Sequence, residues 1–477
     1  MFVGDAGVGR GIISTEFSHI SPRLGFAWDP FGDGKTSVRA AAGIFYGIPG
    51  GNEWNQPGNG APFALRESFG PTPSLTNMYG GVAYGFLNTS PGGGIFPYTY
   101  TPAHPIFIPF AGPEAIATYM KYPSVYQFNL SVQQELPARI TLTTAYVGTL
   151  GRNLATFVDE NYAPYSTAFG TPSTSAASVD ARRQYDSGIP GAAGTLSGIT
   201  YLIPGQTTNF NSLQVSATKT MSRGFTVSGF YVWSRALESA NFVENGLQGA
   251  QDFGVAGKPF TASNNSMGAI GGGLQEERGL MAVNHDSNAA ISGMWNIDYV
   301  HGNKIMEEVA NGWSITSVAL FTSGAPFSMS TGSDNNFDSA NANRPNAVPG
   351  VSPILSPHRC RVCAASANGV TTAWFNKAAF TPNGPGAAGG IGPGGADGNV
   401  GPFSLNGPGL KDIDAGLLRN ITFERGVVFQ FRAEITNVMN WVNLSNPTSS
   451  LSSGNDGKIT GATATQRVIQ LGGRLTF

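Results

Sequence analysis

Apolar and polar residues alternate strictly over many short stretches of this 477-residue chain. In SVYQFNLSVQQEL, Tyr126, Phe128, Leu130 and Val132 share one face, and the residues between them are polar. The same alternation occurs in PRLGFAWDP, SLQVSATKT, GFTVSGFYVWS and VVFQFRAEITN, and no helical pattern competes in strength. Because successive side chains of a strand point to opposite faces, the pattern predicts an all-β chain whose strands have one apolar and one polar face.

The connections between these stretches alternate in length. Short ones, such as ELPARI and MSRGF, are followed by long ones rich in Gly, Pro, Ser and Asn, which run over 48–123, 149–211, 235–288, 323–410 and 438–466. Outer-membrane barrels have short periplasmic turns and long extracellular loops. We therefore expect an antiparallel transmembrane β-barrel with long extracellular loops, since a soluble sandwich has no reason to keep such an alternation.

Composition agrees with a barrel and excludes other classes. Charged residues make up 12% of the chain, which is about half the share usual in soluble proteins. No stretch approaches the roughly 18 continuous apolar residues of a membrane helix. The net charge is −2, and no long run of Lys or Arg is present to neutralise phosphates, so nucleic acid is excluded as a partner.

The strand count suggests an incomplete barrel. Counting back from a periplasmic Phe477 gives about eleven strands, of which the first, 22–29, and the last run in the same direction. Since bacterial single-chain barrels have even strand numbers, we expect strand 22–29 to be an edge strand that lacks a second native neighbour. The stretch MFVGDAGVGRGIISTEF also lacks the features of a secretory signal, so either the chain is cytoplasmic or its true beginning is missing.

Five segments carry a family resemblance: SPRLGFAWDPFGDGKTSVRAAAGIFYG, YPSVYQFNLSVQQELPARITLTTAYVGTLGRNL, NFNSLQVSATKTMSRGFTVSGFYVWSRAL, WFNKAAFTP and FQFRAEITNVMNWVNLSNP. They resemble the C-terminal barrel of Oar-like TonB-dependent receptors, outer-membrane transporters with an N-terminal carboxypeptidase-regulatory-like domain. The resemblance covers nearly the whole chain in order. It implies that residues 1–477 are the C-terminal part of a receptor barrel domain.

The resemblance also implies a function and partners. The parent would import a large nutrient, such as an oligosaccharide, a peptide or a metal chelate, without a cofactor and without covalent chemistry. Its barrel has about 22 strands, so about eleven strands would be half of it, and the signal peptide, regulatory-like domain and plug are not visible here. Expected partners are outer-membrane lipid, the barrel assembly machinery, the unknown nutrient and, through the missing N-terminal part, the TonB complex.

The ending RVIQLGGRLTF resembles the signal that the outer-membrane assembly machinery reads on a nascent barrel. Such a signal has a polar residue, a glycine, a hydrophobic residue and a terminal aromatic, which here are Gln470, Gly472, Leu475 and Phe477. We expect Phe477 to serve as an insertion address and as an interfacial aromatic. The alternative is an ordinary residue of an edge strand.

Two long-loop motifs suggest little chemistry. SPHRCRVCAAS places His358, Cys360 and Cys363 together, but a structural zinc site requires four ligands and only three are offered. In an oxidising compartment, a disulfide between Cys360 and Cys363 is favoured over metal binding or free thiols. GGIGPGG has the glycine spacing of a dinucleotide site, yet no strand precedes it and no helix follows, so a plain loop is favoured.

Other polar and aromatic residues allow further alternatives. Asp412 and Asp414 share a strand face with Glu434 on the lumen side nearby, which suggests a carboxylate pair of a glycan-active enzyme, although lumen charges explain them more simply. Arg419 falls on an apolar face and is tolerable only near a membrane interface. The aromatic stretch 92–110 suits packing on a plug better than stacking on sugar. A receptor fragment is favoured over a passive porin or surface β-protein and over a secreted enzyme.

Overall fold

The computed structural model describes residues 19–47, 114–159, 172–183, 199–239, 278–299, 301–355, 373–382, 398–423, 426–463 and 466–477, apart from 118, 303, 336 and 338–343, together with the single residues 17, 161, 163 and 185. This part contains all the strands that the alternating pattern predicts. In it, no helix is long and apolar enough to cross a membrane.

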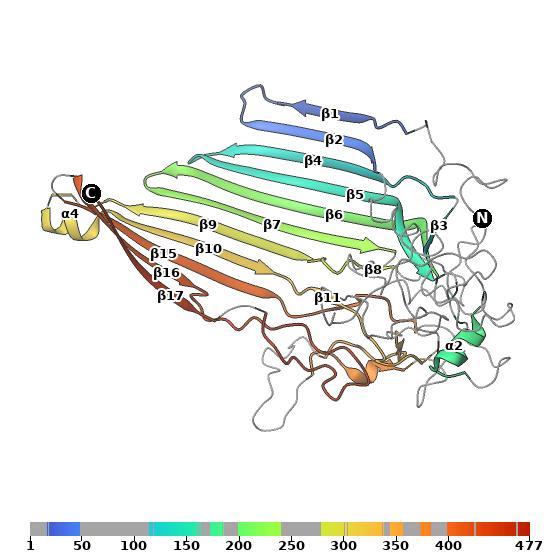
Figure 1. The fold of residues 1–477 in the computed structure, drawn as a ribbon. Helices are drawn as coiled ribbons and strands as arrows, with labels where there is room; N and C mark the ends of the chain where they lie inside the picture. The colour runs from blue at the N-terminus through green and yellow to red at the C-terminus, as the bar shows by residue number, and fades with distance from the viewer. Residues whose placement is uncertain are drawn as a thin grey trace, which may run out of the picture.

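The chain folds into one large sheet in which eleven strands follow each other as a meander (Figure 1). Every pair along this path is antiparallel. The expected fold class and strand number are therefore confirmed. The strands are β1 (Arg23–Trp28), β2 (Thr36–Tyr46), β4 (Ser124–Leu136), β5 (Ile140–Asp159), β6 (Thr200–Ser222), β7 (Phe225–Glu238), β9 (Ser287–Ile297), β10 (Trp313–Thr322), β15 (Leu410–Thr422), β16 (Val428–Thr436) and β17 (Val468–Thr476).

Two short strands extend this sheet at one end. The strand β3 (Glu114–Ile116) pairs parallel with β6, and β8 (Gly279–Leu280) pairs antiparallel with β7. Both lie where the long connections leave the meander, which we call the loop end; the opposite end, with the short connections, is the turn end. The short and long connections that alternate along the sequence thus lie at opposite ends of the sheet.

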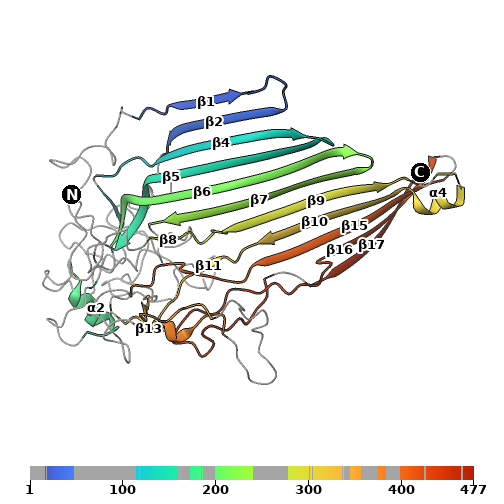
Figure 2. The same ribbon diagram turned by 180° about the vertical axis from the view of Figure 1, so that it is seen from behind.

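The sheet is open, with β1 and β17 at its two edges (Figures 1 and 2). Within the described residues, β1 pairs only with β2, and β17 pairs only with β16. Since all ten pairings between them are antiparallel, the two edge strands point in the same direction. The prediction that the strand at 22–29 is an edge is confirmed.

The strand register confirms one apolar and one polar face. Directly paired residues of neighbouring strands face the same side of a sheet. One row across six strands is apolar and consists of Phe225, Trp295, Ile315, Leu417, Ala433 and Leu471. The adjacent row faces the other side and consists of Thr226, Met294, Thr316, Gly416, Glu434 and Gln470. Trp295 is 42% exposed and Leu471 69% exposed, so the apolar face is not covered by the described part of the chain.

The strands β5 and β6 are longer than predicted and extend into the loop expected over 149–211 from both of its ends, so the predicted loop boundaries were wrong. The pair continues to Asp159 and Thr200, past irregularities in register between Gly151 and Ala155. Asn153 has a φ of 54°, which interrupts the regular pleat. A bulge of this kind breaks the period of two, and for that reason the sequence pattern appeared to end before the strands do.

The described parts of the long connections 323–410 and 438–466 are folded rather than plain loops. The first contains two small sheets, β11 (Pro326–Phe327) with β14 (Leu405–Asn406) and β12 (Asn346–Ala347) with β13 (Phe380–Thr381). The second is joined to the first by an isolated bridge between Ser330 and Ser450. Elsewhere and here, the described residues also form three short helices, namely α2 (Ala176–Arg182), α4 (Lys304–Ala310, between β9 and β10) and the 3-10 helix η5 (Lys377–Ala379). The first two were not predicted, because seven residues are too few to show a helical period.

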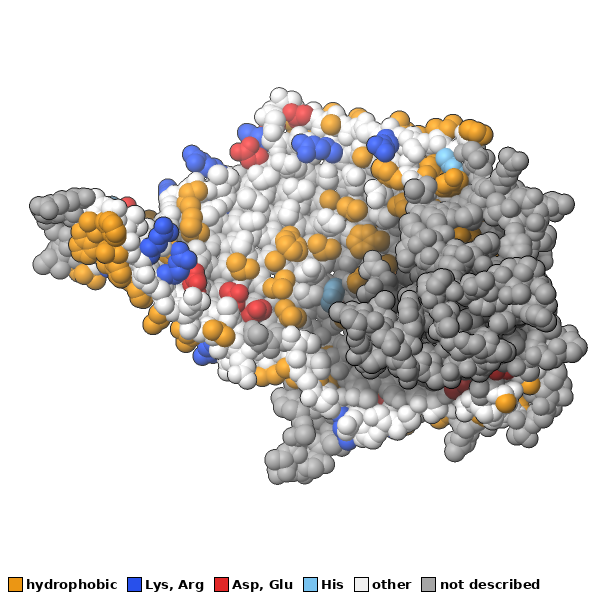
Figure 3. Space-filling view, in the orientation of Figure 1, with side chains coloured by type: hydrophobic (Ala, Val, Ile, Leu, Met, Phe, Trp, Pro, Cys, Tyr) orange, Lys and Arg blue, Asp and Glu red, His pale blue; other side chains and the backbone are white. Residues whose placement is uncertain are grey.

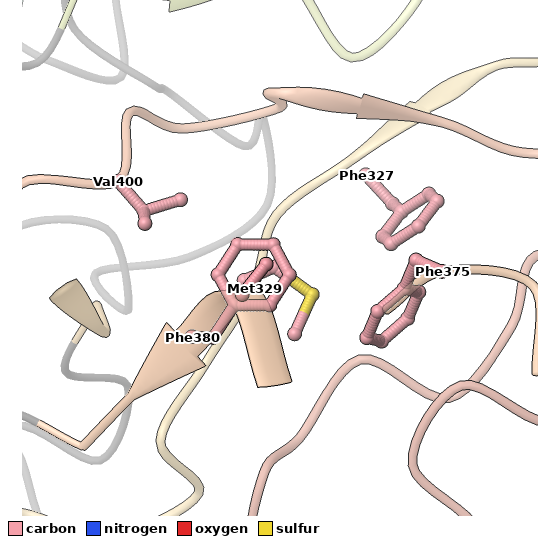
Figure 4. Close-up of a cluster of buried hydrophobic side chains, with 6 residues drawn as sticks. Phe327, Met329, Phe375, Phe380 and Val400 are labelled. Carbon is pink, nitrogen blue, oxygen red and sulfur yellow. The ribbon is translucent and has the colours of Figure 1, made fainter. Parts of the chain in front are cut away.

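A hydrophobic core lies in this loop region (Figure 4). We call it the loop core; it consists of Phe327, Met329, Phe375, Ala379, Phe380 and Val400. The ring of Phe375 lies 6.0 Å from that of Phe327 and 5.9 Å from that of Phe380, between ring centroids. Leu451 packs against the cluster from the second long connection. The loop core therefore holds the two connections together at the loop end.

Candidate functional site: the polar wall of the C-terminal strands

A polar cavity of about 250 Å³ lies on β16 and β17 and is lined by Gln430, Arg432, Glu434, Gln470, Gly472, Gly473 and Arg474. The pairing register brings these residues together: Glu434 faces Gln470, Arg432 faces Gly472, and Gln430 faces Arg474. Gly472 has no side chain, so space is left beside the guanidinium of Arg432. We call this surface the polar wall.

Hydrogen bonds orient the side chains of the polar wall. Arg432 Nη2 donates to Gln430 Oε1 at 3.0 Å, and Arg432 Nη1 lies 3.6 Å from Glu434 Oε1. Gln430 Nε2 in turn donates to Asn420 Oδ1 of β15 at 3.0 Å. Both charged partners of the ion pair are about half exposed, so the pair contributes little to stability. Its side chains remain free to exchange these bonds for bonds to a polar ligand.

The three carboxylates singled out in the sequence do share the polar face. Glu434 pairs with Gly416, and the side chains of Asp412 and Asp414 precede it on the same face of β15. Asp414 Oδ1, however, accepts a hydrogen bond of 2.9 Å from the backbone N–H of Asn437, which fixes the turn after β16. Arg432 engages Glu434. These partners favour structural lumen charges over an acid and base pair for glycoside hydrolysis.

The four residues of the proposed assembly signal lie on both faces of β17. Gln470 and Gly472 line the cavity of the polar wall. Leu475, which pairs with Phe429, lies on the apolar face and is 56% exposed. Phe477 follows the strand and is 98% exposed. An exposed terminal aromatic is available to a partner, and its role in assembly stays a prediction.

Several candidate residues lie outside the described residues. They are His358, Cys360 and Cys363 with the proposed disulfide, the glycines of GGIGPGG and the aromatic stretch 92–110. In the part of the chain that the structure describes, no group of three or more His, Cys, Asp or Glu side chains is placed to hold a metal ion.

A polar network that the sequence did not reveal joins the loop core to the sheet. Asp286, just before β9, accepts hydrogen bonds from Asn284 Nδ2 at 2.9 Å and from Asn406 Nδ2 at 3.2 Å. Asn284 is buried, and its Oδ1 accepts the backbone N–H of Ala236 at 2.7 Å. Trp374 Nε1 donates to the carbonyl of Asn406 at 2.9 Å. Asn406 and Asp286 are 120 residues apart in the sequence. Their contact therefore could not be predicted from sequence spacing and follows only from the fold.

A second polar contact lies beside the loop core. Lys377 Nζ lies 3.4 Å from Asp456 Oδ2; the side chain of Asp456 is 2% exposed, whereas that of Lys377 is 55% exposed. Burial raises the pKa of Asp456 above its usual value of 3.8, and the opposing effect of the Lys377 charge is smaller. The ionised carboxylate is therefore costly in the folded loops.

The sequence matches, over residues 1–470, the family model described as outer membrane beta barrel domain. No curated protein matches it. Solved structures to which the chain is similar include the outer membrane transporter YddB from Escherichia coli, with a TM-score of 0.44, 10% identity and coverage of 95% of this chain and 40% of that chain. A second is the FrpB iron transporter from Neisseria meningitidis, with a TM-score of 0.37, 9% identity and coverage of 95% of this chain and 38% of that chain. A third is the ferric-catecholate import receptor Fiu from E. coli, with a TM-score of 0.36, 11% identity and coverage of 94% of this chain and 34% of that chain. The chain thus spans 40% or less of these solved proteins.

Proposed function

Since the chain belongs to the outer membrane beta barrel domain family, we propose that it forms the C-terminal part of the wall of a TonB-dependent receptor. Its location is the outer membrane of a Gram-negative type cell. The apolar face then contacts lipid, and the polar face lines the interior of the barrel. The turn end is periplasmic, and the loop end is extracellular.

The observation that carries the proposal is the direction of the two edge strands. β1 and β17 are parallel to each other, so joining them directly would create a parallel pair inside an antiparallel barrel. An odd number of further strands between them restores antiparallel pairing throughout. We propose that the parent polypeptide supplies these strands, and that residues 1–477 are one portion of its barrel domain.

The polar wall suits the interior of a transporter. It presents the guanidinium groups of Arg432 and Arg474, the carboxylate of Glu434 and the amides of Gln430 and Gln470 around one cavity. Such a set exchanges hydrogen bonds with a passing polar solute and offers no nucleophile with an adjacent base. We propose that the parent imports a large polar nutrient, an oligosaccharide, a peptide or a metal chelate, and that the chain is not an enzyme.

The resemblance to Oar-like receptors supports the finer assignment. In that assignment, a regulatory-like domain, a plug and a TonB-contacting segment precede the barrel in the parent. Gln470, Gly472, Leu475 and Phe477 form the signal for the barrel assembly machinery, and Cys360 and Cys363 form a disulfide in an extracellular loop.

Uptake in the native host tests the proposal against its alternative, a passive porin or surface β-protein without a plug. Deleting the gene should abolish uptake of one labelled nutrient class. Dissipating the proton-motive force or deleting TonB should abolish the same uptake in the wild type. A passive porin predicts the opposite: uptake would persist without TonB, and the purified chain would give steady ion conductance in a planar bilayer.

The length of the native polypeptide tests the fragment assignment separately. An antibody against the loop core region should detect, in isolated outer membranes, a protein longer than 477 residues. Detection of a 477-residue species alone, with a closed barrel, would contradict the assignment to a larger receptor while leaving the membrane location intact.

A further inference from the structure

Charged side chains on the polar face of β15, β16 and β17 are separated by sign along the strands. From the loop end to the turn end, their order is Asp412, Asp414, Glu434, Arg432 and Arg474. Over these strands, Figure 3 shows acidic side chains nearer the loops and basic ones nearer the turn end. Arg474 pairs with Gln430, four positions from Glu434, and a rise of about 3.3 Å per residue puts about 13 Å between the two levels. The turn-end half of the polar wall is therefore positively charged.

The guanidinium of Arg474 is not neutralised by its neighbours. Its direct partner across the strands is Gln430, a neutral amide that cannot balance the charge. Among the residues that the structure describes, Arg474 has no hydrogen bond and no ion pair. Arg432, in contrast, donates to Gln430 and lies 3.6 Å from Glu434. One cation of the polar wall is thus balanced by a carboxylate, and the other is not.

The cavity beside Arg474 has room for one polar group. Its volume is about 250 Å³, which is below the roughly 300–1,000 Å³ usual for a site that takes up a whole ligand. Gly472 lies between Gln470 and Arg474 on the same face of β17, and a Cβ atom built there would meet only Arg432 Cβ, at 3.9 Å. The amide of Gln470 also has no partner in the described part of the chain. The space above Gly472 is therefore open to a group that accepts hydrogen bonds from both sides.

The lining of the cavity favours an oxyanion over a sugar or an apolar group. Two arginines and one glutamate among the lining residues give a net charge of +1. No aromatic or aliphatic side chain belongs to this described lining, so a sugar ring finds no surface on which to stack. The planar fork of an arginine matches the two oxygens of a carboxylate, and such charge-assisted pairs are stronger than neutral hydrogen bonds.

Resting on the function proposed above, we propose that the turn-end half of the polar wall binds the carboxylate of an acidic solute as the solute passes through the barrel. Arg474 donates two N–H groups to the carboxylate, and the amide of Gln470 donates from the other side of Gly472. Arg432 and Glu434 form a half-exposed and therefore weak pair, so Arg432 turns to the bound anion at little cost. A cavity of this size holds one acidic group and not the whole solute. The solute is thus held weakly enough to move on.

Two other groups share this chemistry, namely a phosphate and an acidic side chain from the rest of the parent polypeptide. The residues of β17 that line the cavity are exposed, and under the proposed function they face the path of the solute. This exposure favours a mobile acid over a permanently docked side chain. The carboxylate is favoured over phosphate because a single unbalanced arginine matches a single negative charge.

Equilibrium dialysis of the native protein, purified in detergent from host outer membranes, tests the proposal. The probes are radiolabelled glutarate, its neutral diamide glutaramide, and inorganic phosphate. Glutarate should bind at least about tenfold more tightly than glutaramide, because only the acid forms charge-assisted hydrogen bonds. Arg474→Gln should lower glutarate binding by about tenfold. Equal binding of glutaramide, or tighter binding of inorganic phosphate, would overturn the carboxylate site.

A variant with the opposite effect separates an anion site from a structural role. Glu434→Gln removes the competing carboxylate and frees Arg432, so glutarate binding should increase by about threefold or more. Arg39→Gln removes an exposed arginine from the polar face of β2, outside the cavity, and is the matched control that should bind as the wild type does. Heat-modifiable migration verifies that each variant is folded. Unchanged glutarate binding in both folded polar-wall variants, or the same loss in Arg39→Gln as in Arg474→Gln, would overturn the proposal.

Thermal unfolding and uptake separate the remaining outcomes. If Arg474→Gln lowers the unfolding temperature but leaves glutarate binding unchanged, an acidic residue of the parent polypeptide pairs with Arg474 and the solute site is refuted. If the protein imports its nutrient through TonB but does not bind glutarate, the acid site fails and the proposed function stands. If glutarate binds as expected while uptake persists without TonB, the site stands and the receptor assignment fails.

Discussion

Removing the ring of Phe375 tests whether the extracellular connections behave as a folded unit. The side chain is 2% exposed and contacts the rings of Phe327 and Phe380 at centroid distances of 6.0 and 5.9 Å. Truncating a buried Phe to Ala costs about 3–5 kcal/mol, of which each aromatic pair accounts for about 0.5–1.5 kcal/mol. The loop core has only six buried members, so a loss of this size should open most of it.

Protease cleavage of intact cells measures the effect of Phe375→Ala directly. If cleavage requires opening of the loops, the rate should rise at least about a hundredfold, because about 1.4 kcal/mol corresponds to a factor of ten in the open population. The barrel strands obtain their stability from backbone pairing and lipid contact. Heat-modifiable migration of the variant should therefore remain that of the wild type.

Phe31→Ala is the matched control for this experiment. Phe31 lies in the turn between β1 and β2 and is 75% exposed, so its removal creates no cavity and should leave loop cleavage unchanged. If the Phe375→Ala variant is cleaved at the wild-type rate, the loop core does not hold the connections together. Loss of the folded barrel in that variant would show that the loops and the sheet unfold as one unit, which also refutes the reasoning.

Three further predictions concern the loops and the C-terminus. Because burial raises the pKa of Asp456 above 3.8, the folded loops bind its proton more tightly than the unfolded chain does. Stability of the loop core should therefore increase as pH falls through that raised pKa, and Asp456→Asn should remove this dependence in protease cleavage measured over a pH series. Phe477→Ser should lower outer-membrane insertion of the parent far more than the roughly 1.5–3 kcal/mol bound on its burial suggests, while Gln466→Ala should insert normally; equal insertion of both would refute the signal. Cys360 and Cys363 should resist alkylation in outer-membrane material until it is reduced, and quantitative alkylation beforehand would exclude the disulfide.

The sheet could be predicted from sequence because each strand carries its own pattern. In β4, Tyr126, Phe128, Leu130 and Val132 alternate with polar residues. Such a pattern predicts the apolar and polar faces of a strand, and the order of the strands predicts the edges of the sheet, before the pairing of the strands is known. The period of two fails where the chain bulges, as after Gly151 in β5, and there the prediction ended the strand too early. Periodicity thus identifies a regular strand and misses its irregular continuation.

The loop core and the network at Asp286 could not be predicted, because they depend on contacts between distant segments. Phe327 and Phe375 carry no periodic pattern, and Asn406 bonds to a residue 120 positions away. The polar wall was partly foreseeable. The alternation placed Gln430, Arg432 and Glu434 on one face, and only the register with β17 added Gln470 and Arg474 to the same cavity.

The two regions of the chain use apolar residues in opposite ways. On the strands, large apolar side chains such as Trp233 and Leu471 are 61% and 69% exposed, whereas Phe375 and Met329 in the loops are at most 2% exposed. In a soluble protein the first group would be an aggregation hazard, but lipid is its natural solvent. The extracellular loops face water and therefore bury their apolar side chains in a core of their own. Lipid-facing strands and water-facing loops together give the chain a mean hydropathy of only −0.07. The strands are held together by backbone pairing and lipid contact, whereas the described loops are held together by the loop core.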